Sequence, residues 1–263
     1  MTQSTQTIAP QLLSGRHALV TGGNRGIGSV IAKTLLSHGA RVTVLSRNAV
    51  PANSSEQNDE NRCDAIADVT DSSAVSQAFQ QARSKFGPIE ILVNNAGQAA
   101  SAPFLKTDAV LWRRMHAVNL DGTFHCSQAA LPDMLAAGWG RIINIASTAG
   151  LTGYGYISAY CASKHAVIGL TRALAVEVAT KGITVNAVCP GYTDTDMVKD
   201  TVANIVAKTG RTAEQALAEL TARNPQRRLI KPQEVATTVA WLCLPGAESI
   251  TGQAIAISGG EVM

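Results

Sequence analysis

A tyrosine and a lysine stand four residues apart in the segment SAYCASKHAV, as Tyr160 and Lys164. Residues i and i+4 of an α-helix share one face, so both side chains can enter the same crevice. A free tyrosine has a pKa of ~10 and is a poor proton donor at neutral pH, but a neighbouring ammonium favours the phenolate and lowers that pKa. The pair therefore predicts general acid–base chemistry, in which the lysine adjusts the acidity of the tyrosine.

A glycine-rich turn, TGGNRGIG, runs from Thr21 to Gly28 between an expected strand and an expected helix. Free backbone amides and the dipole at a helix N-terminus favour a pyrophosphate, and glycine allows close approach of a ligand. The glycines at 22, 26 and 28 have GxxxGxG spacing and not the GxGxxG spacing of other dinucleotide folds. The turn predicts nucleotide binding, and glycines that only close a tight connection are the alternative.

Two arginines indicate which dinucleotide is bound. Arg47, in LSRN, ends the second expected strand, where dinucleotide folds place an acidic residue for NAD(H) and a basic one for a 2′-phosphate. Arg25 lies inside the glycine turn, and paired guanidiniums suit phosphate geometry. The arginines favour NADP(H) over NAD(H), and solvated surface charges are the alternative interpretation.

Strands and helices alternate along the rest of the chain, as period-two and period-3.6 patterns of apolar residues indicate. The expected strands cover residues 16–23, 41–46, 63–69, 89–97, 141–147, 183–188 and 253–258, and the expected helices cover 27–38, 71–86, about 107–137 and 159–179. Apolar strands such as ILV and IINIA show no alternation, which is typical of a sheet buried on both faces. The pattern predicts a single α/β domain with a parallel sheet.

The composition of the chain limits which partners and which cellular location we expect. A length of 263 residues suits one domain, and no apolar run of the ~18 residues needed to span a bilayer interrupts it. The net charge of +3 is not gathered in a basic tract, so no nucleic-acid partner is expected. The five cysteines are scattered without CxxC spacing, so we expect reduced thiols, no metal site and a cytoplasmic protein.

Two segments depart from this regular alternation. The start, MTQSTQTIAPQLL, has no signal-peptide pattern, so we expect a disordered tail over 1–13 before a domain over 14–263. Residues 194–228 interrupt the rhythm near the C-terminus, and TAEQALAEL offers a capping box from Thr212 to Gln215. We interpret this segment as a flap over the substrate, with Met197, Val198, Val202, Ile205 and Val206 forming an apolar wall.

The chain resembles the short-chain dehydrogenase/reductase family over nearly its whole length. The motifs that carry the resemblance occur in the family's order, as TGGNRGIG, Asp68 in DV, NNAG, Asn119, Ser147, YCASK and the PG at Pro190. Ser147 stands 13 residues before Tyr160, as in the family. The resemblance implies a Rossmann-type, doubly wound parallel sheet of about seven strands and an NAD(P)-dependent oxidoreductase acting on CH–OH groups.

The resemblance also implies a catalytic tetrad of Asn119, Ser147, Tyr160 and Lys164. Tyr160 and Ser147 would contact the substrate, with Ser147 holding the carbonyl oxygen and Tyr160 protonating it as hydride arrives from the nicotinamide. Lys164 would also bond the nicotinamide ribose, and Asn119 would fix a water that links Lys164 to solvent. Taken singly, each residue has a structural interpretation as a cap or a helix residue, and only the joint spacing favours catalysis.

The implied cofactor contacts gather at the carboxyl ends of the strands. They are Gly22, Asn24, Arg25, Gly26, Ile27, Gly28, Arg47, Asp68, Val69, Asn95, Ala96, Gly97, Tyr160, Lys164, Pro190, Gly191, Thr193 and Thr195. In this arrangement the adenine lies near Asp68 and Val69, and the threonines at 193 and 195 meet the nicotinamide amide or the phosphates.

Within the family, GWGRIINIAS and the segment around PGYTDTDM are most similar to acetoacetyl-CoA and other 3-ketoacyl reductases. This similarity implies reduction of a 3-ketoacyl thioester to the 3-hydroxyacyl compound, or the reverse oxidation. Carrier-dependent relatives place basic residues where this helix ends DMLAAGWG, although Lys181 keeps a second docking position. A CoA thioester therefore gains weight over a carrier-bound one. Arg227 and Arg228 could meet a CoA phosphate, with a solvated pair as the alternative.

Three further alternatives concern the substrate, the class of protein and its assembly. A free cyclic or aromatic alcohol or ketone also suits an apolar pocket. A non-catalytic cofactor-sensing protein would show a broken tetrad, whereas all four positions are intact here. The resemblance also implies a homotetramer or homodimer that packs through helices near residues 111–137 and 160–180.

Overall fold

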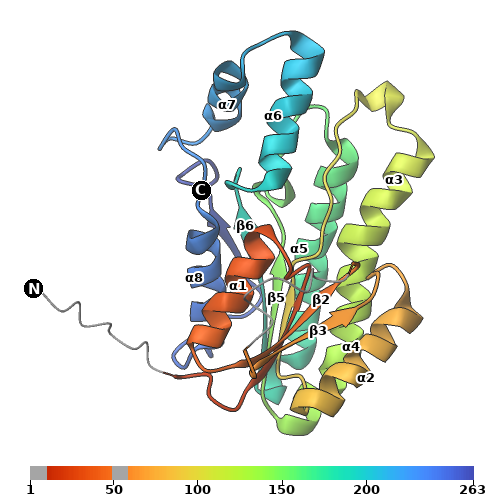
Figure 1. Ribbon diagram of the computed structural model, residues 1–263, viewed down its shortest axis with the longest axis vertical. Coiled ribbons are helices and arrows are strands. Elements are labelled where there is room, and N and C mark those ends of the chain that lie inside the picture. The colour runs from red at the N-terminus through yellow and green to blue at the C-terminus, as the bar shows by residue number, and fades with distance from the viewer. Residues whose placement is uncertain (1–10, 49–58) are drawn as a thin grey trace, which may run out of the picture.

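A computed structural model of the chain describes residues 11–48 and 59–263. These residues form one α/β unit of three layers, a central parallel sheet with helices on both faces (Figure 1). The seven strands have the order β3-β2-β1-β4-β5-β6-β7, and every neighbouring pair is parallel. The predicted fold class, a Rossmann-type doubly wound sheet in a single domain, is confirmed.

The strands are short and mostly buried. Their bounds are β1 His17–Thr21, β2 Arg41–Ser46, β3 Arg62–Ile66, β4 Ile91–Asn94, β5 Gly140–Ile145, β6 Ile183–Pro190 and β7 Ala254–Ile257. Every residue of β1, β4, β5 and β6 is buried, because helices cover both faces of the middle of the sheet. This burial explains why these strands lack polar alternation. The edge strand β7 is only half-buried.

Helices form the two outer layers. Their bounds are α1 Gly26–Ser37, α2 Ser72–Phe86, α3 Ala109–His116, α4 Gly122–Ala137, α5 Ser158–Val178, α6 Asp196–Thr209, α7 Ala213–Thr221 and α8 Pro232–Cys243. One hydrophobic core joins α1 and α8 to the sheet, and a second joins α2, α4 and α5 to the opposite face. The sheet is therefore packed against helices on both faces, which fixes the position of the strand ends.

Helix α2 forms where the sequence predicts it. Asp71 caps its N-terminus by accepting hydrogen bonds from the N–H groups of Ser73 and Ala74. Val75 and Phe79 belong to the buried stripe of this helix, and Gly87 ends it with a φ of 80°. The 3.6-residue period, the cap and the terminal glycine all agree, and the prediction is confirmed.

Helix α8 is an element that the sequence analysis did not assign. Pro232 occupies its first turn, and the carboxylate of Glu234 accepts a hydrogen bond of 2.7 Å from the N–H of Lys231. Val235 and Val239 are fully buried in the core shared with α1. The proline and the acidic residue in the first turn are start signals that could have identified the helix.

The helical stretch expected over 107–137 is divided in three. A π-helical segment, Ala117–Asp121, lies between α3 and α4. Single π-helical turns inside α-helices are rare and frequently occur at functional sites. Asn119, a predicted catalytic residue, lies within this segment and is buried.

The packed chain starts earlier than the expected boundary at residue 14. Leu13 is 1% exposed, and its N–H donates a hydrogen bond of 2.9 Å to His38 O. The expectation of a tail reaching residue 13 is therefore wrong at its inner end, because Leu13 contributes to the core. Residues 1–10 of that tail lie outside the described residues, as does most of the irregular connection expected after β2.

The flap expected over 194–228 contains α6 and α7, which stand above the carboxyl ends of the strands (Figure 1). The Thr212 hydroxyl accepts from the Gln215 N–H, and the Gln215 side chain accepts from the Thr212 N–H, so the predicted capping box is confirmed. Among the described residues, no helix has both the length and the apolar character that crossing a membrane requires.

Candidate active site

The glycine turn after β1 and the loop after β4 are bonded to one another. Thr21, the last residue of β1, accepts hydrogen bonds at its Oγ1 from the N–H groups of Asn95 (3.0 Å) and Ala96 (2.9 Å). The amide Nδ2 of Asn95 donates back to Thr21 O (2.9 Å) and Gly22 O (3.2 Å). These bonds hold two of the predicted cofactor segments side by side at the carboxyl edge of the sheet.

Close packing requires the glycines of this turn. Gly22 and Gly26 have φ values of 64° and 54°, in the left-handed region that favours glycine. A Cβ on Gly28 would lie 2.4 Å from Gly22 O and 2.5 Å from Asn95 Nδ2, so helix α1 approaches the turn too closely for any side chain. Closing the turn is thus one role of the glycines, and bringing the helix N-terminus to the strand end is another.

The N-terminus of α1 fits an anionic ligand. Arg25 is its N-cap residue, and no side chain caps the helix. The first amides of an α-helix have no partner within the helix, so those of Gly26, Ile27 and Gly28 are oriented for a phosphate. Asn24, also in the turn, is half-buried. The uncapped N-terminus of α1 is compatible with the predicted pyrophosphate contacts.

Arg25 and Arg47 lie at the same edge of neighbouring strands. Strand β1 pairs with β2 in a register that places Thr21 opposite Leu45, so the turn after β1 adjoins the end of β2. Both arginines are exposed, and neither guanidinium makes a hydrogen bond or ion pair within residues 11–48 and 59–263. Their guanidiniums are available to a phosphate, as the sequence predicts.

The predicted adenine contacts follow β3. The Oδ1 atom of Asp68 accepts hydrogen bonds from the N–H (2.9 Å) and the Oγ1 (2.8 Å) of Thr70, which fixes its turn. Val69 is 7% exposed and packs on Gly122 of α4, where a Cβ would lie 2.6 Å from Val69 Cγ2. The side chain of Val69 therefore belongs to the core.

Ser147 lies just beyond β5, with its side chain toward the helix that carries the tyrosine. Its Oγ accepts a hydrogen bond of 3.1 Å from Ala149 N–H, so it caps the 3₁₀ helix Thr148–Gly150. The same side chain also lies near enough to the Tyr160 hydroxyl to lower the pKa of that phenol. The structural and catalytic interpretations of Ser147 are therefore compatible, because capping orients the hydroxyl that meets the tyrosine.

Tyr160 and Lys164 lie in the first two turns of α5 and share a face, as the i to i+4 spacing predicts. The Lys164 Nζ lies 5.8 Å from the centre of the Tyr160 ring. It donates a hydrogen bond of 2.8 Å to Ile145 O at the end of β5, and Lys164 is only 5% exposed. An ammonium has three donors, so two N–H groups remain for other partners.

Burial dominates the acidity of both residues. Desolvation raises the pKa of Tyr160 to about 12, with a smaller lowering contribution from Ser147. Desolvation also lowers the pKa of Lys164 to about 8. The net shift of the Tyr160 pKa is therefore upward, opposite to the lowering expected from Lys164, because the loss of water dominates it. The tyrosine is a protonated acid at neutral pH.

The side chain of Asn119 forms hydrogen bonds with two different segments of the site. Its Oδ1 accepts from Gln98 N–H (2.9 Å), and its Nδ2 donates to Gln98 O and to Ser163 Oγ, both at 3.0 Å. Asn119 is 1% exposed. Both amide hydrogens are thus used, so the side chain has no donor left for the water that the resemblance implies. Its observed role is to tie the NNAG loop to α5 beside Lys164.

A space beside the lysine is kept open by Gly97. A Cβ on Gly97 would lie 3.2 Å from Asn119 Oδ1 and 3.6 Å from Lys164 Nζ. Glycine therefore leaves the ammonium approachable from the NNAG loop. A ribose hydroxyl of a dinucleotide is a suitable acceptor for an ammonium in this position.

The loop after β6 reaches back to the glycine turn. Gly191, next to Pro190, donates its N–H to Ile257 O at 3.0 Å. Thr193 is 4% exposed and donates its hydroxyl to Gly191 O, whereas Thr195 is the N-cap residue of α6. The Cγ2 atom of Thr195 would lie 3.6 Å from a Cβ on Gly26. The loop after β6 therefore lies next to the N-terminus of α1.

The structure adds three polar residues to this region that the sequence analysis did not single out. Thr21 organises the NNAG loop, and Gln98 and Ser163 are the partners of Asn119. Thr21 directly precedes the glycines and Ser163 directly precedes Lys164, so proximity to the motifs was the available signal. Among the residues that the structure describes, no three His, Cys, Asp or Glu side chains gather as metal ligands.

Arg227 and Arg228, candidates for a CoA phosphate, are both engaged within the chain. Arg228 forms two hydrogen bonds of 2.7 Å with the carboxylate of Glu234. The Nη1 atom of Arg227 donates to Ala222 O at 2.6 Å. A phosphate would have to compete with these contacts, so the pair is poorly placed as an open anion site.

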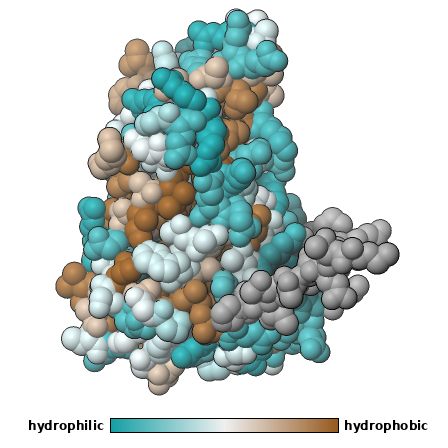
Figure 2. Space-filling view, turned by 90° about the vertical axis from the view of Figure 1, so that its left-hand side faces the viewer, coloured by the Kyte–Doolittle hydropathy of each residue, from teal (hydrophilic) through white to brown (hydrophobic). Residues whose placement is uncertain are grey.

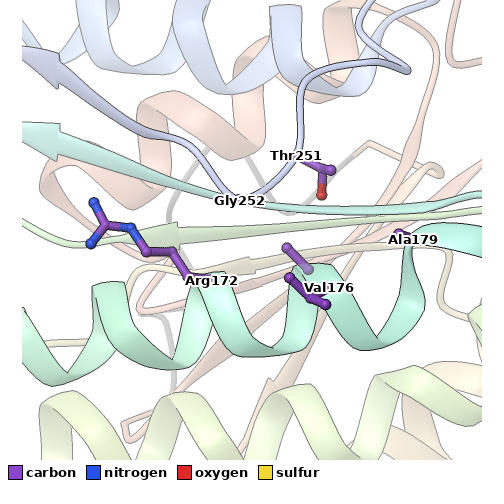
Figure 3. A pocket seen from close by; sticks show the side chains of 6 residues that line it. Arg172, Val176, Ala179, Thr251 and Gly252 are labelled. Carbon is purple, nitrogen blue, oxygen red and sulfur yellow. The ribbon is translucent and has the colours of Figure 1, made fainter.

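A separate pocket lies at the other end of the strands from this site. It is formed by the second half of α5 and by the loop that precedes β7 (Figure 3). Its lining residues are Arg172, Ala175, Val176, Ala179, Thr251 and Gly252. Because Thr251 and Gly252 precede β7, this pocket is at the amino end of that strand, away from the carboxyl edge where the predicted site residues meet.

Comparison with known proteins agrees with this fold and site. The family model described as short chain dehydrogenase matches residues 16–225. The chain is 37% identical over 253 residues to a D-beta-hydroxybutyrate dehydrogenase of Rhizobium meliloti, covering 93% of this chain and 98% of the relative. It is 38% identical over 253 residues to a putative ketoacyl reductase of Streptomyces coelicolor, covering 92% and 95%.

Two further relatives extend the comparison. The chain is 37% identical over 251 residues to the 3-oxoacyl-(acyl-carrier-protein) reductase of Escherichia coli, covering 95% of this chain and 98% of that protein. A crystal structure of an actinorhodin polyketide ketoreductase variant with NADPH has a TM-score of 0.89 and 37% identity, covering 94% and 97%. A doubly wound parallel sheet with a glycine-rich turn after its first strand is the architecture of dinucleotide-binding proteins. The chain belongs to the short-chain dehydrogenase family of oxidoreductases.

Proposed function

We propose that the chain is an NADPH-dependent ketoreductase that converts a 3-ketoacyl thioester into the 3-hydroxyacyl compound or catalyses the reverse oxidation. The observation that carries the proposal is the gathering of Ser147, a protonated Tyr160 and the Lys164 side chain at the end of β5, where Lys164 Nζ lies 5.8 Å from the centre of the Tyr160 ring and donates to Ile145 O. Relatives named ketoacyl reductase and hydroxybutyrate dehydrogenase support a substrate with oxygen at the third carbon.

The chain's own residues supply substrate orientation and the proton. In this proposal the hydroxyls of Ser147 and Tyr160 both donate hydrogen bonds to the substrate's carbonyl oxygen. Bound NADPH supplies the hydride that attacks the carbonyl carbon. Tyr160 gives its proton to the oxygen as negative charge develops there, and the Lys164 ammonium stabilises the phenolate that remains. Oxidation of the alcohol uses the same groups in reverse.

The preference for NADPH rests on Arg25 and Arg47, whose guanidiniums have no partner among the described residues. Titrating NADP and NAD against intrinsic tryptophan fluorescence tests it. Arg47→Ala should weaken NADP binding by about 10-fold or more, because a hydrogen bond to a charged group contributes about 1.5–3 kcal/mol, and should leave NAD binding unchanged. Arg113→Ala, at an exposed position on α3, is the control. Equal weakening for both cofactors would contradict the proposal.

The thioester assignment is tested by following NADPH absorbance against 3-ketoacyl-CoAs of increasing chain length and against cyclic and aromatic ketones. Most of the predicted apolar wall is accessible to a substrate. Met197 is 48% exposed, and the half-buried residues are Val202, Ile205 and Val206. Val198, by contrast, is 8% exposed and packs inside. We expect activity with the thioesters. Activity with cyclic ketones alone would favour the free-ketone alternative, and cofactor binding without turnover of any ketone would favour a sensing protein.

We also propose that the chain forms a homodimer or homotetramer. Val176 on α5 is 80% exposed, and the strand β7 beside it is a half-buried sheet edge. Figure 2 shows separate groups of hydrophobic side chains among hydrophilic ones on the face that lies at the left of Figure 1, where α8 runs. Trp241 of α8 is 46% exposed. A second copy of the chain would cover such surfaces.

A further inference from the structure

A second group of polar side chains gathers around Tyr154, on the loop between Ser147 and α5. The Tyr154 hydroxyl lies 2.6 Å from Glu261 Oε1 and 2.8 Å from Thr148 Oγ1. A phenol has a single proton, so Tyr154 donates to the carboxylate and accepts from the threonine. Burial and the carboxylate both raise the pKa of Tyr154, which keeps the phenol protonated as a donor.

The partners of Tyr154 come from segments far apart in the chain. Thr148 directly follows Ser147 and is 4% exposed. Arg223, at the end of the flap, places its guanidinium carbon 4.6 Å from the centre of the Tyr154 ring and donates to Gly153 O at 3.3 Å. Glu261 is the third residue from the C-terminus. One tyrosine thus connects the catalytic loop, the flap and the chain end.

The C-terminal residues 259–261 pack between the loop after β6 and the flap. A Cβ on Gly191 would lie 3.0 Å from Glu261 Oε2, so the carboxylate also borders the cofactor loop. Gly259 has a φ of 63° and packs against Asn224, where a Cβ would lie 2.2 Å from Oδ1. Gly260 faces Pro225 in the same way at 3.3 Å. The C-terminal turn therefore holds Glu261 in a defined position.

The loop that this contact anchors contains a strained residue. Tyr156 has a φ of 66°, in the left-handed region that side chains other than glycine rarely adopt, and it is 72% exposed. Such a conformation costs of the order of 1–3 kcal/mol and persists only where the surroundings impose it. Tyr156 lies between the Tyr154 anchor and the start of α5, which carries Tyr160. Releasing the anchor would let this segment relax.

We infer that Tyr154 and Glu261 are positioning residues, whose hydrogen bond holds the Ser147 loop and the end of the flap in the geometry that catalysis requires. Neither side chain needs to touch the reacting atoms. The inference rests on the proposed ketoreductase function, and it is independent of which ketone is the substrate. It assigns the last residues of the chain a role in turnover.

The test compares Tyr154→Phe, Glu261→Ala and Glu261→Gln with the wild-type protein on the most active ketone. Tyr154→Phe and Glu261→Ala remove the bond, and kcat should fall by about 10- to 100-fold, since small displacements of catalytic groups have effects of that size. Glu261→Gln keeps an acceptor oxygen, so its kcat should stay within about threefold of wild type. The double variant should be no slower than either single variant, because one bond is lost in each.

Three measurements separate positioning from a loss of folding. Thermal unfolding identifies variants that fold, tryptophan fluorescence measures NADPH affinity, and trypsin cleavage after Lys208 and Arg211 reports flap opening without any substrate. Cleavage should accelerate in Tyr154→Phe while NADPH affinity stays unchanged. Glu214→Gln removes an exposed flap carboxylate outside the network and is the charge-matched control.

Several outcomes would overturn the inference. Wild-type kcat and wild-type cleavage in a folded Tyr154→Phe would show that the bond positions nothing. An equal loss in Glu261→Gln and Glu261→Ala would assign the effect to charge, and a raised KM at unchanged kcat would assign it to substrate binding. If the wild-type protein reduces no ketone, the proposed function fails, and the cleavage assay alone decides whether the anchor exists.

Discussion

At the scale of single residues, burial shifts Tyr160 and Lys164 toward their neutral forms. The pKa of Tyr160 is raised to about 12 and that of Lys164 is lowered to about 8, in each case mainly by desolvation. A protonated tyrosine suits reduction, in which the substrate oxygen must gain a proton. Oxidation requires the phenolate form of Tyr160. Bound ligand and Lys164 together therefore have to supply the positive charge that stabilises it.

Replacing Tyr160 with phenylalanine should nearly abolish turnover. The hydroxyl is the proton donor, and loss of a positioned general acid reduces rates by about 10²- to 10⁴-fold. NADPH binding should persist, because the glycine turn and the arginines remain. Steady-state kinetics and a fluorescence titration measure both effects. Tyr156→Phe removes an exposed hydroxyl four residues earlier and should keep wild-type activity, whereas substantial activity in Tyr160→Phe would refute the mechanism.

The buried lysine should make stability depend on pH. Its pKa is about 8 when folded and 10.5 in the reference state, so the unfolded chain binds more protons between these values and stability rises with pH across that window. Below pH 8 the full cost of burying the charge is present. Thermal unfolding of the ligand-free protein from about pH 7 to 9.5 should show a smaller rise in Tm for Lys164→Met than for wild type. Identical slopes would contradict this account.

At the scale of elements, the strand ends and the helix starts decide where the site residues lie. Periodicity and caps identify β1, α1, α2 and α5 from sequence, because local patterns specify those elements. Helix α8 has start signals in Pro232 and Glu234 but a weaker apolar period, because its apolar residues are interspersed with threonine and alanine, and its buried face is set by the packing of Val235 and Val239 in the core shared with α1. The π-helical turn at Asn119 likewise has no sequence signature.

The contact between α1 and the glycine turn should not tolerate a methyl group. In Gly28→Ala the Cβ would lie 2.4 Å from Gly22 O, so overpacking should destabilise the protein by about 1–3 kcal/mol and weaken NADPH binding. Thermal unfolding and a cofactor titration measure the two effects. The matched control is Gly169→Ala in α5, where a Cβ meets nothing within 4 Å. It should be neutral or stabilise by up to about 1 kcal/mol, and equal effects at both positions would exclude the packing explanation.

At the scale of the whole molecule, both faces of the sheet are covered, but α5 and the edge strand β7 keep exposed apolar surface. The pocket of Figure 3 belongs to this region and lies at the amino end of β7. The cofactor loops lie at the opposite, carboxyl end of the strands. Association through the exposed apolar surface would leave the carboxyl edge of the sheet accessible. The proposed assembly surface and the candidate active site are therefore separate parts of the molecule.

Light scattering after size exclusion should show a dimer or tetramer. Val176→Asp places a charge on the exposed α5 surface and should shift the protein toward smaller species, because a desolvated, unpaired charge opposes association. Lys208→Glu, on the flap, changes an exposed charge elsewhere and should leave the mass unchanged. A wild-type monomer at micromolar concentration would contradict the proposed assembly.

The sequence by itself determined the class of fold, the identity of the Tyr160 and Lys164 pair, and the glycine turn. These features depend on local spacing, which a linear chain displays directly. Only the tertiary structure decided the protonation of Tyr160 and the role of the Asn119 amide, since both depend on burial and on partners distant in sequence. The same is true of the contact that brings Glu261 to Tyr154, 107 positions earlier, because packing of the chain end against the flap creates it.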